Sequence, residues 1–162
     1  AAGYAKGVPM GGDISAAPAG AAPVFVASAL KDALGGNLDR IQIIKGWVDA
    51  KGEPQDKTFD VAWSGDRKPG KSGKVPAVGN TVDLQKATYT NEIGSGELMG
   101  TWTDPEFDPR QHAIYYVRVL EIPTPRFTTY DAVRNNLPLL KDVPATVQER
   151  AWTSPIWYTP SK

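Results

Sequence analysis

The amino-acid sequence predicts an all-β protein: an antiparallel β-sandwich with an extended N-terminal arm and one short helix. Two observations support this fold class. After Pro23, short segments of alternating apolar and polar residues recur, and Gly, Pro, Asn and Asp separate them at short intervals. Only one segment has the composition of a helix. Short alternating strands with frequent turns are typical of a β-sandwich.

The chain of 162 residues is long enough for one domain with a buried core. We divide it into an arm over residues 1–23 and a sandwich domain over residues 24–162. The arm consists mostly of Ala, Gly and Pro, so it buries little apolar area. Its larger apolar residues are spaced along it: Tyr4, Val8, Met10 and Ile14. We therefore expect the arm to lie along a surface that belongs to a longer protein, of which this chain is one piece.

The apolar pattern predicts seven strands, over residues 24–30, 39–49, 58–64, 80–90, 96–104, 112–122 and 146–160. In TFDVAWS, Phe59, Val61 and Trp63 lie on one face of the expected strand. The segment HAIYYVRVLEI is apolar on both faces, as in a central strand. The last strand is interrupted at Pro155, which places it at an edge or at a bulge.

The helix is predicted near residues 128–140, in the segment TTYDAVRNNLPLL. Thr128 is its expected N-cap residue, and Asp131 follows three residues later in a weak capping-box arrangement.

The composition excludes several kinds of partner. Eighteen basic and eighteen acidic residues cancel, so nothing indicates binding to nucleic acid or to an acidic membrane surface. No apolar run approaches the roughly 20 residues that a transmembrane helix needs. The chain has no cysteine, so disulfides and thiolate metal sites are excluded.

Residues 65–72 satisfy the phosphate-loop pattern G-x-x-x-x-G-K-[ST]. A working phosphate loop precedes a helix, whose N-terminus holds the phosphates together with the loop amides. Here Gly73, Pro76 and Gly79 follow at once and leave no helical periodicity. We therefore predict an exposed hairpin loop and no nucleotide site.

Metal sites find little support in the sequence. Asp104, Glu106 and Asp108 resemble the start of a calcium loop, but Pro109 stands where that loop needs glycine. His112 is the only histidine, so a site built from two or three histidines is excluded, and a surface position at the start of a strand explains it. We predict no metal, cofactor or catalytic residue in this chain.

Five residues are candidates for an interface or a ligand contact: Lys45, Trp47, Trp102, Tyr115 and Arg118. Aromatic residues at alternate positions form either a ligand platform or the core and rim of a sandwich, and we favour the core. Arg118 stands within an apolar strand, so it must pair with a carboxylate or backbone carbonyls, or face an interface. We favour structural pairing for Arg118.

Several segments together resemble the C-terminal portion of the bacterial domain-of-unknown-function 3604 family, and they cover nearly the whole chain in order. The resemblance is carried mainly by GNTVDL, EIPTPR and QERAWTSPIWYTP. Members of this family are several times longer, and their N-terminal part resembles the polymerase-and-histidinol-phosphatase (PHP) superfamily of metal-dependent hydrolases. The resemblance implies a divalent metal only in that N-terminal part, because its His-x-His motifs have no counterpart here. It also favours a periplasmic or secreted location.

Two hypotheses follow from the resemblance and the residues together. In the first, the chain is a C-terminal accessory β-sandwich that shapes or covers the active site of a hydrolase, and its partner is the N-terminal catalytic part. In the second, it is a binding or assembly module for a carbohydrate, a polymer or a partner chain, and its arm pairs with the sheet edge of a second copy.

Overall fold

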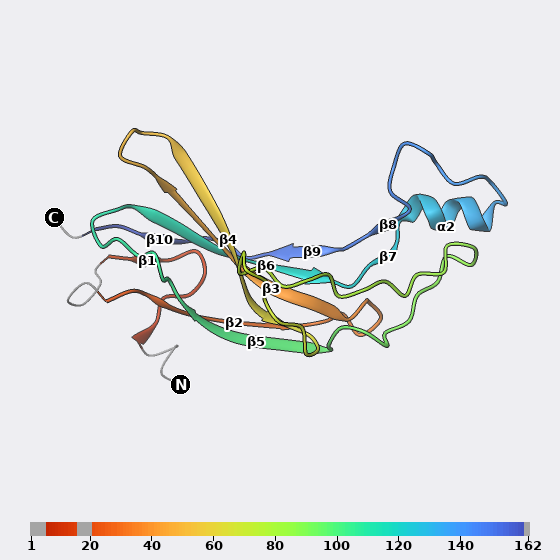
Figure 1. Ribbon diagram of the computed structural model, residues 1–162, viewed down its shortest axis with the longest axis horizontal. Coiled ribbons are helices and arrows are strands. Elements are labelled where there is room, and N and C mark those ends of the chain that lie inside the picture. Colours follow the sequence, from red (N-terminus) through yellow and green to blue (C-terminus); the bar gives the residue numbers. More distant parts are fainter. Residues whose placement is uncertain (1–5, 16–20, 161–162) are drawn as a thin grey trace.

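The computed structural model describes residues 6–15 and 21–160, and they form two packed sheets with a small lobe at one end (Figure 1). The all-β prediction is confirmed. The elements in chain order are β1 (Asp13–Ile14), β2 (Val24–Leu30), β3 (Leu38–Val48), β4 (Pro54–Trp63), β5 (Glu97–Thr103), β6 (Ala113–Glu121), β7 (Thr124–Pro125), α2 (Phe127–Arg134), β8 (Thr146–Val147), β9 (Arg150–Trp152) and β10 (Ile156–Tyr158). In the described part of the chain, no helix is long and apolar enough to cross a membrane.

The large sheet has the strand order β1-β10-β6-β3-β4, and β9 also pairs with β6. Its pairs are antiparallel, except that β1 runs parallel to β10. The long strands β3 and β6 lie at its centre, as the two-sided apolar pattern of residues 112–122 predicts. The strand predicted over residues 146–160 is instead three short strands. β8 pairs with β7 outside this sheet, whereas β9 and β10 both pair with β6 and are separated by residues 153–155, which include the break expected at Pro155.

The small sheet consists of β2 and β5 and packs on one face of the large sheet, which we call the inner face (Figure 1). Buried and exposed residues alternate along β2 and β5, and the buried ones point toward this face. Ile41 and Ile43 of β3 are fully buried there, and burial of each such side chain stabilises the fold by about 1.5–3 kcal/mol. The core between the sheets is formed by Phe25, Ala27, Leu38, Ile41, Ile43, Leu98, Ala113, Tyr115 and Tyr158.

Gly100 allows β5 to approach β4 closely at one side of the sandwich. A Cβ atom at this position would lie 2.9 Å from the carbonyl oxygen of Val61 and 3.1 Å from the Cβ atom of Ala62. A larger residue at position 100 would push the two strands apart. Gly100 therefore marks a close approach of the β4 and β5 backbones, as glycine in a strand interior often does.

Part of the arm lies on the edge of the chain's own large sheet. Asp13 and Ile14 are in register with Trp157 and Tyr158, and Ile14 packs against the core. The amide of Gly11 donates to the carbonyl oxygen of Pro155 at 2.9 Å. The predicted anchor Tyr4 lies outside the described residues, as do residues 16–20.

The strand predicted over residues 80–90 is wrong. This segment is a series of turns with one isolated bridge between Asp83 and Thr88. The side chains of Asn80 and Asp83 accept hydrogen bonds from backbone amides two residues later, and such Asx turns compete with a strand. Ala87 has a φ of 50°, which a strand does not allow.

The helix is shorter than predicted and begins one residue earlier. Thr128 lies inside α2, and the N-cap residue is Arg126, whose side chain makes no capping hydrogen bond. The hydroxyl of Thr129 instead donates to the carbonyl oxygen of Ala145 at 2.7 Å, which ties α2 to the segment before β8. Asn136 has a φ of 52°, and Pro138 follows, so the helix stops before Leu139.

Candidate functional site

The outer face of the large sheet, which is turned away from β2 and β5, carries a hollow of about 390 Å³. Gly46, Ile114 and Trp157 are in register on β3, β6 and β10, so their positions lie side by side on this face. The adjacent residues Trp47 and Tyr158 pack against the core. We call this site the Gly46 hollow; its lining consists of Gly46, Trp47, Val48, Pro54, Gln55, His112, Ala113, Ile114, Trp157, Tyr158 and Thr159.

Ile114 forms the floor of the Gly46 hollow, and its side chain packs over Gly46 because residue 46 has no side chain. A Cβ atom there would lie 3.0 Å from Cγ1 and 3.3 Å from Cδ1 of Ile114. Gly46 has a strand conformation that any residue can adopt, so the glycine is not required by the backbone. Glycine in a strand interior costs stability, and such positions often mark the close approach of another group.

The rim of the Gly46 hollow combines one aromatic ring with polar groups. The Trp157 side chain is 48 % exposed. His112 is exposed at the start of β6 and has no hydrogen-bond partner within residues 6–15 and 21–160. The Gln55 amide nitrogen donates to the carboxylate of Asp49 at 3.2 Å, which leaves its carbonyl oxygen available. None of the lining residues is Asp, Glu, Lys or Arg.

Lys45 lies on the inner face, buried in a cluster with Asp104 and Tyr115. Its Nζ atom is 2.6 Å from Oδ2 of Asp104 and donates to the carbonyl oxygen of Glu106 at 2.7 Å. The Tyr115 hydroxyl donates to the same Oδ2 atom at 2.7 Å. Burial raises the pKa of Tyr115, and the Asp104 carboxylate beside it raises the pKa further. Each polar group in this cluster has a partner, so the cluster stabilises the sandwich and leaves no free reactive group.

The predicted aromatic candidates fall into two places. Trp102 is part of the core, with its ring centroid 4.7 Å from that of Phe59 and 5.8 Å from that of Phe25. Trp47 lies beneath Lys45, with the Nζ atom 5.4 Å from its ring centroid, and also lines the Gly46 hollow. Of the five candidates, Trp47 alone lines this hollow.

Arg118 lies on the outer face, farther along β6 than the Gly46 hollow. Its Nε atom donates to Oε1 of Gln42 at 2.8 Å, so it pairs with a side-chain amide rather than with a carboxylate. Trp152 of β9 is in register with Arg118 and is 58 % exposed. The outer face therefore carries a second aromatic residue outside the hollow.

A second charged cluster fixes the loop of residues 64–76 to the large sheet. The Asp39 carboxylate is 2.7 Å from Nη1 of Arg67 and 3.1 Å from Nε of Arg40. Asp60 pairs with Arg40 at 3.1 Å and accepts a hydrogen bond from the Val75 amide at 2.7 Å. Sequence reasoning missed this cluster, because charged residues within β3 and β4 show no signal that identifies their partners.

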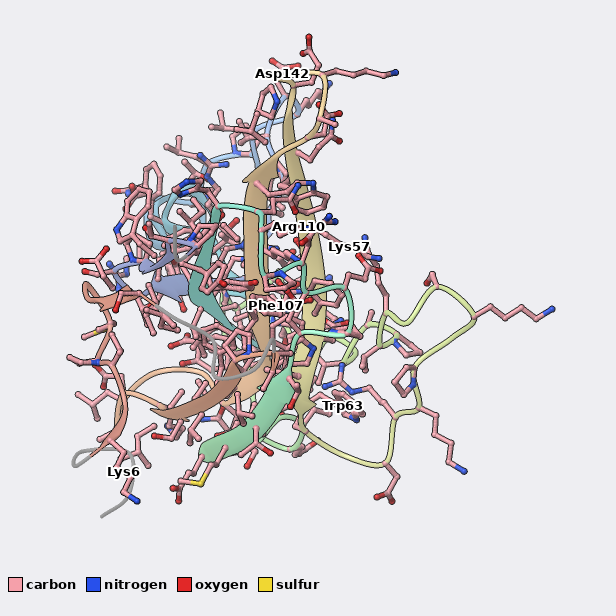
Figure 2. The ribbon with its side chains drawn as sticks, turned by 90° about the vertical axis from the view of Figure 1, so that its left-hand side faces the viewer. Lys6, Lys57, Trp63, Phe107, Arg110 and Asp142 are labelled. Atoms are coloured by element: carbon pink, nitrogen blue, oxygen red, sulfur yellow. The ribbon has the colours of Figure 1, made fainter. Side chains whose placement is uncertain are left out.

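The phosphate-loop pattern has no helix after it. Residues 65–80 form turns and extended chain that project beyond Trp63 to one side of the sheets (Figure 2). Arg67, inside the pattern, donates to the carbonyl oxygens of Ser64 and Pro76. Arg67 therefore helps to hold the loop in place. The predicted exposed loop is present, but it does not close a hairpin, because the next strand, β5, pairs with β2 and not with β4.

The residues of the calcium-like pattern have separate partners. Asp104 is buried with Lys45, Glu106 pairs with Lys57, and Asp108 pairs with Arg110. Among the described residues, no three His, Cys, Asp or Glu side chains converge in a way that could hold a metal ion.

The model of a family described as "Protein of unknown function (DUF3604)" matches residues 1–160. The chain belongs to the DUF3604 family. No curated protein and no solved structure gave a match. The resemblance to the DUF3604 family is thereby confirmed, and the sandwich described above is the fold of the described part of this DUF3604 region.

The DUF3604 sandwich has a second apolar surface, on the side of β2 and β5 that faces away from the core. The in-register strands place Ser28 beside Met99 and Leu30 beside Glu97 on this side. Four large apolar side chains are 65–77 % exposed here: Val24, Val26, Leu30 and Met99. We call this surface the small-sheet face.

Proposed function

We propose that this DUF3604 chain is the accessory β-sandwich of a longer protein whose other part is a metal-dependent hydrolase of the PHP type. In this proposal, the sandwich packs against the catalytic part and shapes or covers the mouth of its active site. The reacting groups and the metal ion belong to the catalytic part.

The main support for this proposal is that the buried charged side chains form ion pairs with one another. Lys45 and Asp104 pair inside the core, and Asp39 and Asp60 pair with arginines that hold a loop. A catalytic site needs ionisable groups that converge on a reacting atom and remain free to exchange protons. Here the buried ionisable groups are already paired with one another, which supports a structural use of them.

The small-sheet face supports contact with another polypeptide. Contiguous large apolar side chains on a protein surface commonly mark a protein–protein contact. Two neighbouring strands contribute to this face, so a partner can pack on it without rearrangement of the core. We assign this face to the contact with the catalytic part.

Turnover by the purified chain tests the proposal. The chain of residues 1–162 is incubated with bis-p-nitrophenyl phosphate in the presence of Mn²⁺ or Zn²⁺, and p-nitrophenolate release is followed. We expect no release above that of the buffer and no stoichiometric metal binding in equilibrium dialysis. Metal binding with a stoichiometry of one together with metal-dependent release would contradict the accessory role.

A second function, assembly through the arm, is tested separately. β1 already occupies the edge of β10 within its own chain, so exchange of the arm between copies would require the release of this pair. Light scattering of the chain with and without residues 1–22 gives the molecular mass of each form. A dimer that becomes a monomer on removal of the arm would support assembly, and a monomer in both forms would exclude it.

A further inference from the structure

We propose that the Gly46 hollow binds one uncharged pyranose ring of a glycan, with the ring stacked on Trp157. The inference extends the proposed function, since it assumes that the sandwich recognises a ligand and does not transform it. It assigns to the outer face a role that differs from that of the small-sheet face.

The charge of the lining indicates an uncharged ligand. The lining has no acidic or basic side chain apart from the single imidazole of His112. Two carboxylates are in register with residues of the hollow without lining it: Asp56 beside Gly46 on β4, and Asp13 beside Trp157 on β1. A carboxylate there accepts hydrogen bonds from hydroxyl groups and repels an anion. A phosphate or a uronate would therefore bind more weakly than a neutral sugar.

The mixture of groups at the rim favours a sugar over a purely apolar ligand. Ile114, Val48 and the Trp157 ring offer an apolar surface of the kind that packs against the C–H face of a pyranose. His112 and Thr159 have polar side-chain atoms at the same rim. An apolar ligand would cover these atoms without giving them hydrogen-bond partners, at a cost in free energy. Sugar hydroxyl groups would supply those partners.

The size and shape of the hollow fit a single ring. Its volume of about 390 Å³ lies at the small end of the range for ligand pockets. The Ile114 side chain covers Gly46 and forms the floor, and Trp157 is in register with Ile114 on the neighbouring strand. A ring that lies over Ile114 can therefore contact the Trp157 side chain.

The test is a titration of the ¹⁵N-labelled chain, followed by the indole resonance of Trp157 and the amide resonance of Gly46. The probes are cellotetraose, xylotetraose, maltotetraose and mannotetraose, with tetragalacturonate as the anionic counterpart and methyl glucopyranoside as a single free ring. We expect saturable shifts at both residues with at least one neutral tetrasaccharide, and weaker binding of tetragalacturonate. If methyl glucopyranoside binds as tightly as the tetrasaccharide, the natural ligand is a free monosaccharide and not a glycan chain.

Matched variants locate the site. Trp157→Ala is expected to weaken binding of the active tetrasaccharide by about tenfold or more, because the stacked ring is lost. Gly46→Val forces the Ile114 side chain out of its place over residue 46 and so changes the floor, with the same expected effect. Trp152→Ala removes the other exposed tryptophan of the outer face and should change the affinity by less than about twofold. Circular dichroism and thermal unfolding of each variant show whether it folds.

Three results would overturn the inference. The first is the absence of shifts at Gly46 and Trp157 with every neutral saccharide at 10 mM. The second is binding that is lost in Trp152→Ala and kept in Trp157→Ala. The third is saturation of the hollow by indole or a Phe-containing peptide while no sugar binds, which would assign it to an aromatic side chain of a partner. None of these results produces turnover or metal binding, so each leaves the accessory role standing.

Discussion

Lys45 shows at the scale of a single residue how this sandwich uses its charges. A lysine in the middle of a strand could serve as a surface ligand contact or as a buried structural charge, and its sequence position does not distinguish the two. The structure buries its side chain to 3 % exposure against Asp104 and Tyr115. A buried pair of this kind is costly to break, because the remaining charge has no water to solvate it.

Replacement of Asp104 by Asn is expected to destabilise the chain by about 3–5 kcal/mol, since Lys45 would then remain charged and unpaired in the core. The two oxygens of Asp104 also accept from the Tyr115 hydroxyl and the Glu106 amide, and an asparagine has only one acceptor oxygen for these donors. Urea unfolding followed by tryptophan fluorescence measures the change.

The double variant Lys45→Met with Asp104→Asn is the matched control. Because it removes both charges, it should lose less stability than the sum of the two single variants by about 0.5–3 kcal/mol. Strict additivity of the two losses would show that the pair does not act as a unit.

Glu121 is expected to make the stability of the folded chain depend on pH, in a direction that follows from its pKa shift. Partial burial raises its pKa above the ordinary value, and the nearby Glu149 and Asp32 raise it further. The folded chain therefore holds this proton more tightly than the unfolded chain does. The contribution of Glu121 to stability is present below its unfolded pKa, near 4.3, and is lost as the pH rises through the folded value.

Glu121→Gln removes this titration. We expect the free energy of unfolding of the variant, relative to that of the unmodified chain, to rise between about pH 4 and pH 7. Urea unfolding at several pH values checks the trend, with Glu92→Gln on an exposed turn as the baseline. A difference that stays constant over this range would contradict the assignment.

At the scale of elements, the sequence predicted those strands whose alternation reflects one buried and one exposed side. β2, β5 and β6 begin and end within one residue of their predicted bounds. β4 begins four residues earlier than predicted, because its first half is polar and exposed on the hairpin that projects from the sandwich (Figure 1). The strand prediction over residues 80–90 is wrong because the apolar residues of this segment alternate while its Asn and Asp side chains form turns.

The charged cluster around Asp60 holds an element that has few apolar anchors. Asp60→Ala removes the acceptor for the Val75 amide, so we expect the loop of residues 64–76 to open more often. Cleavage by trypsin after Lys71 or Lys74 should accelerate by about tenfold or more, given the usual strength of a hydrogen bond to a charged group.

Asp66→Ala is the control for this loop, because Asp66 is exposed in the same segment and makes no hydrogen bond or ion pair there. Its cleavage rate should match that of the unmodified chain. Equal rates for Asp60→Ala and Asp66→Ala would show that the cluster does not hold the loop.

At the scale of the whole molecule, the sandwich has two outward surfaces of different character. The small-sheet face alternates exposed apolar side chains with Thr, Ser and Glu, whereas the Gly46 hollow combines an aromatic ring with polar groups. The sequence predicted the fold and the family but not these surfaces. Single strands show which residues point outward, but the neighbours of Gly46 come from strands up to about 110 residues apart in the chain, and only the fold brings them together.

The small-sheet face yields a prediction about packing. Val26→Asp combined with Met99→Asp should change the stability of the isolated chain by less than about 1 kcal/mol, because both side chains are exposed. In the longer protein, the same pair should weaken the contact with the catalytic part, so that limited proteolysis releases the sandwich faster.

Leu34→Asp serves as the control for that prediction, since Leu34 is highly exposed and lies outside the small-sheet face. Release rates that are equal for both variants would show that the small-sheet face is not the contact.

The most direct test of the account is the mass of the polypeptide that carries this sequence in its source cells. An antibody raised against residues 24–160, followed by peptide mass spectrometry of the detected band, gives this mass. The account predicts a polypeptide several times heavier than the 17.4 kDa of this chain, with peptides of a metal-binding catalytic part in the same band. A single band at 17.4 kDa, with no partner chain recovered alongside it, would contradict the account.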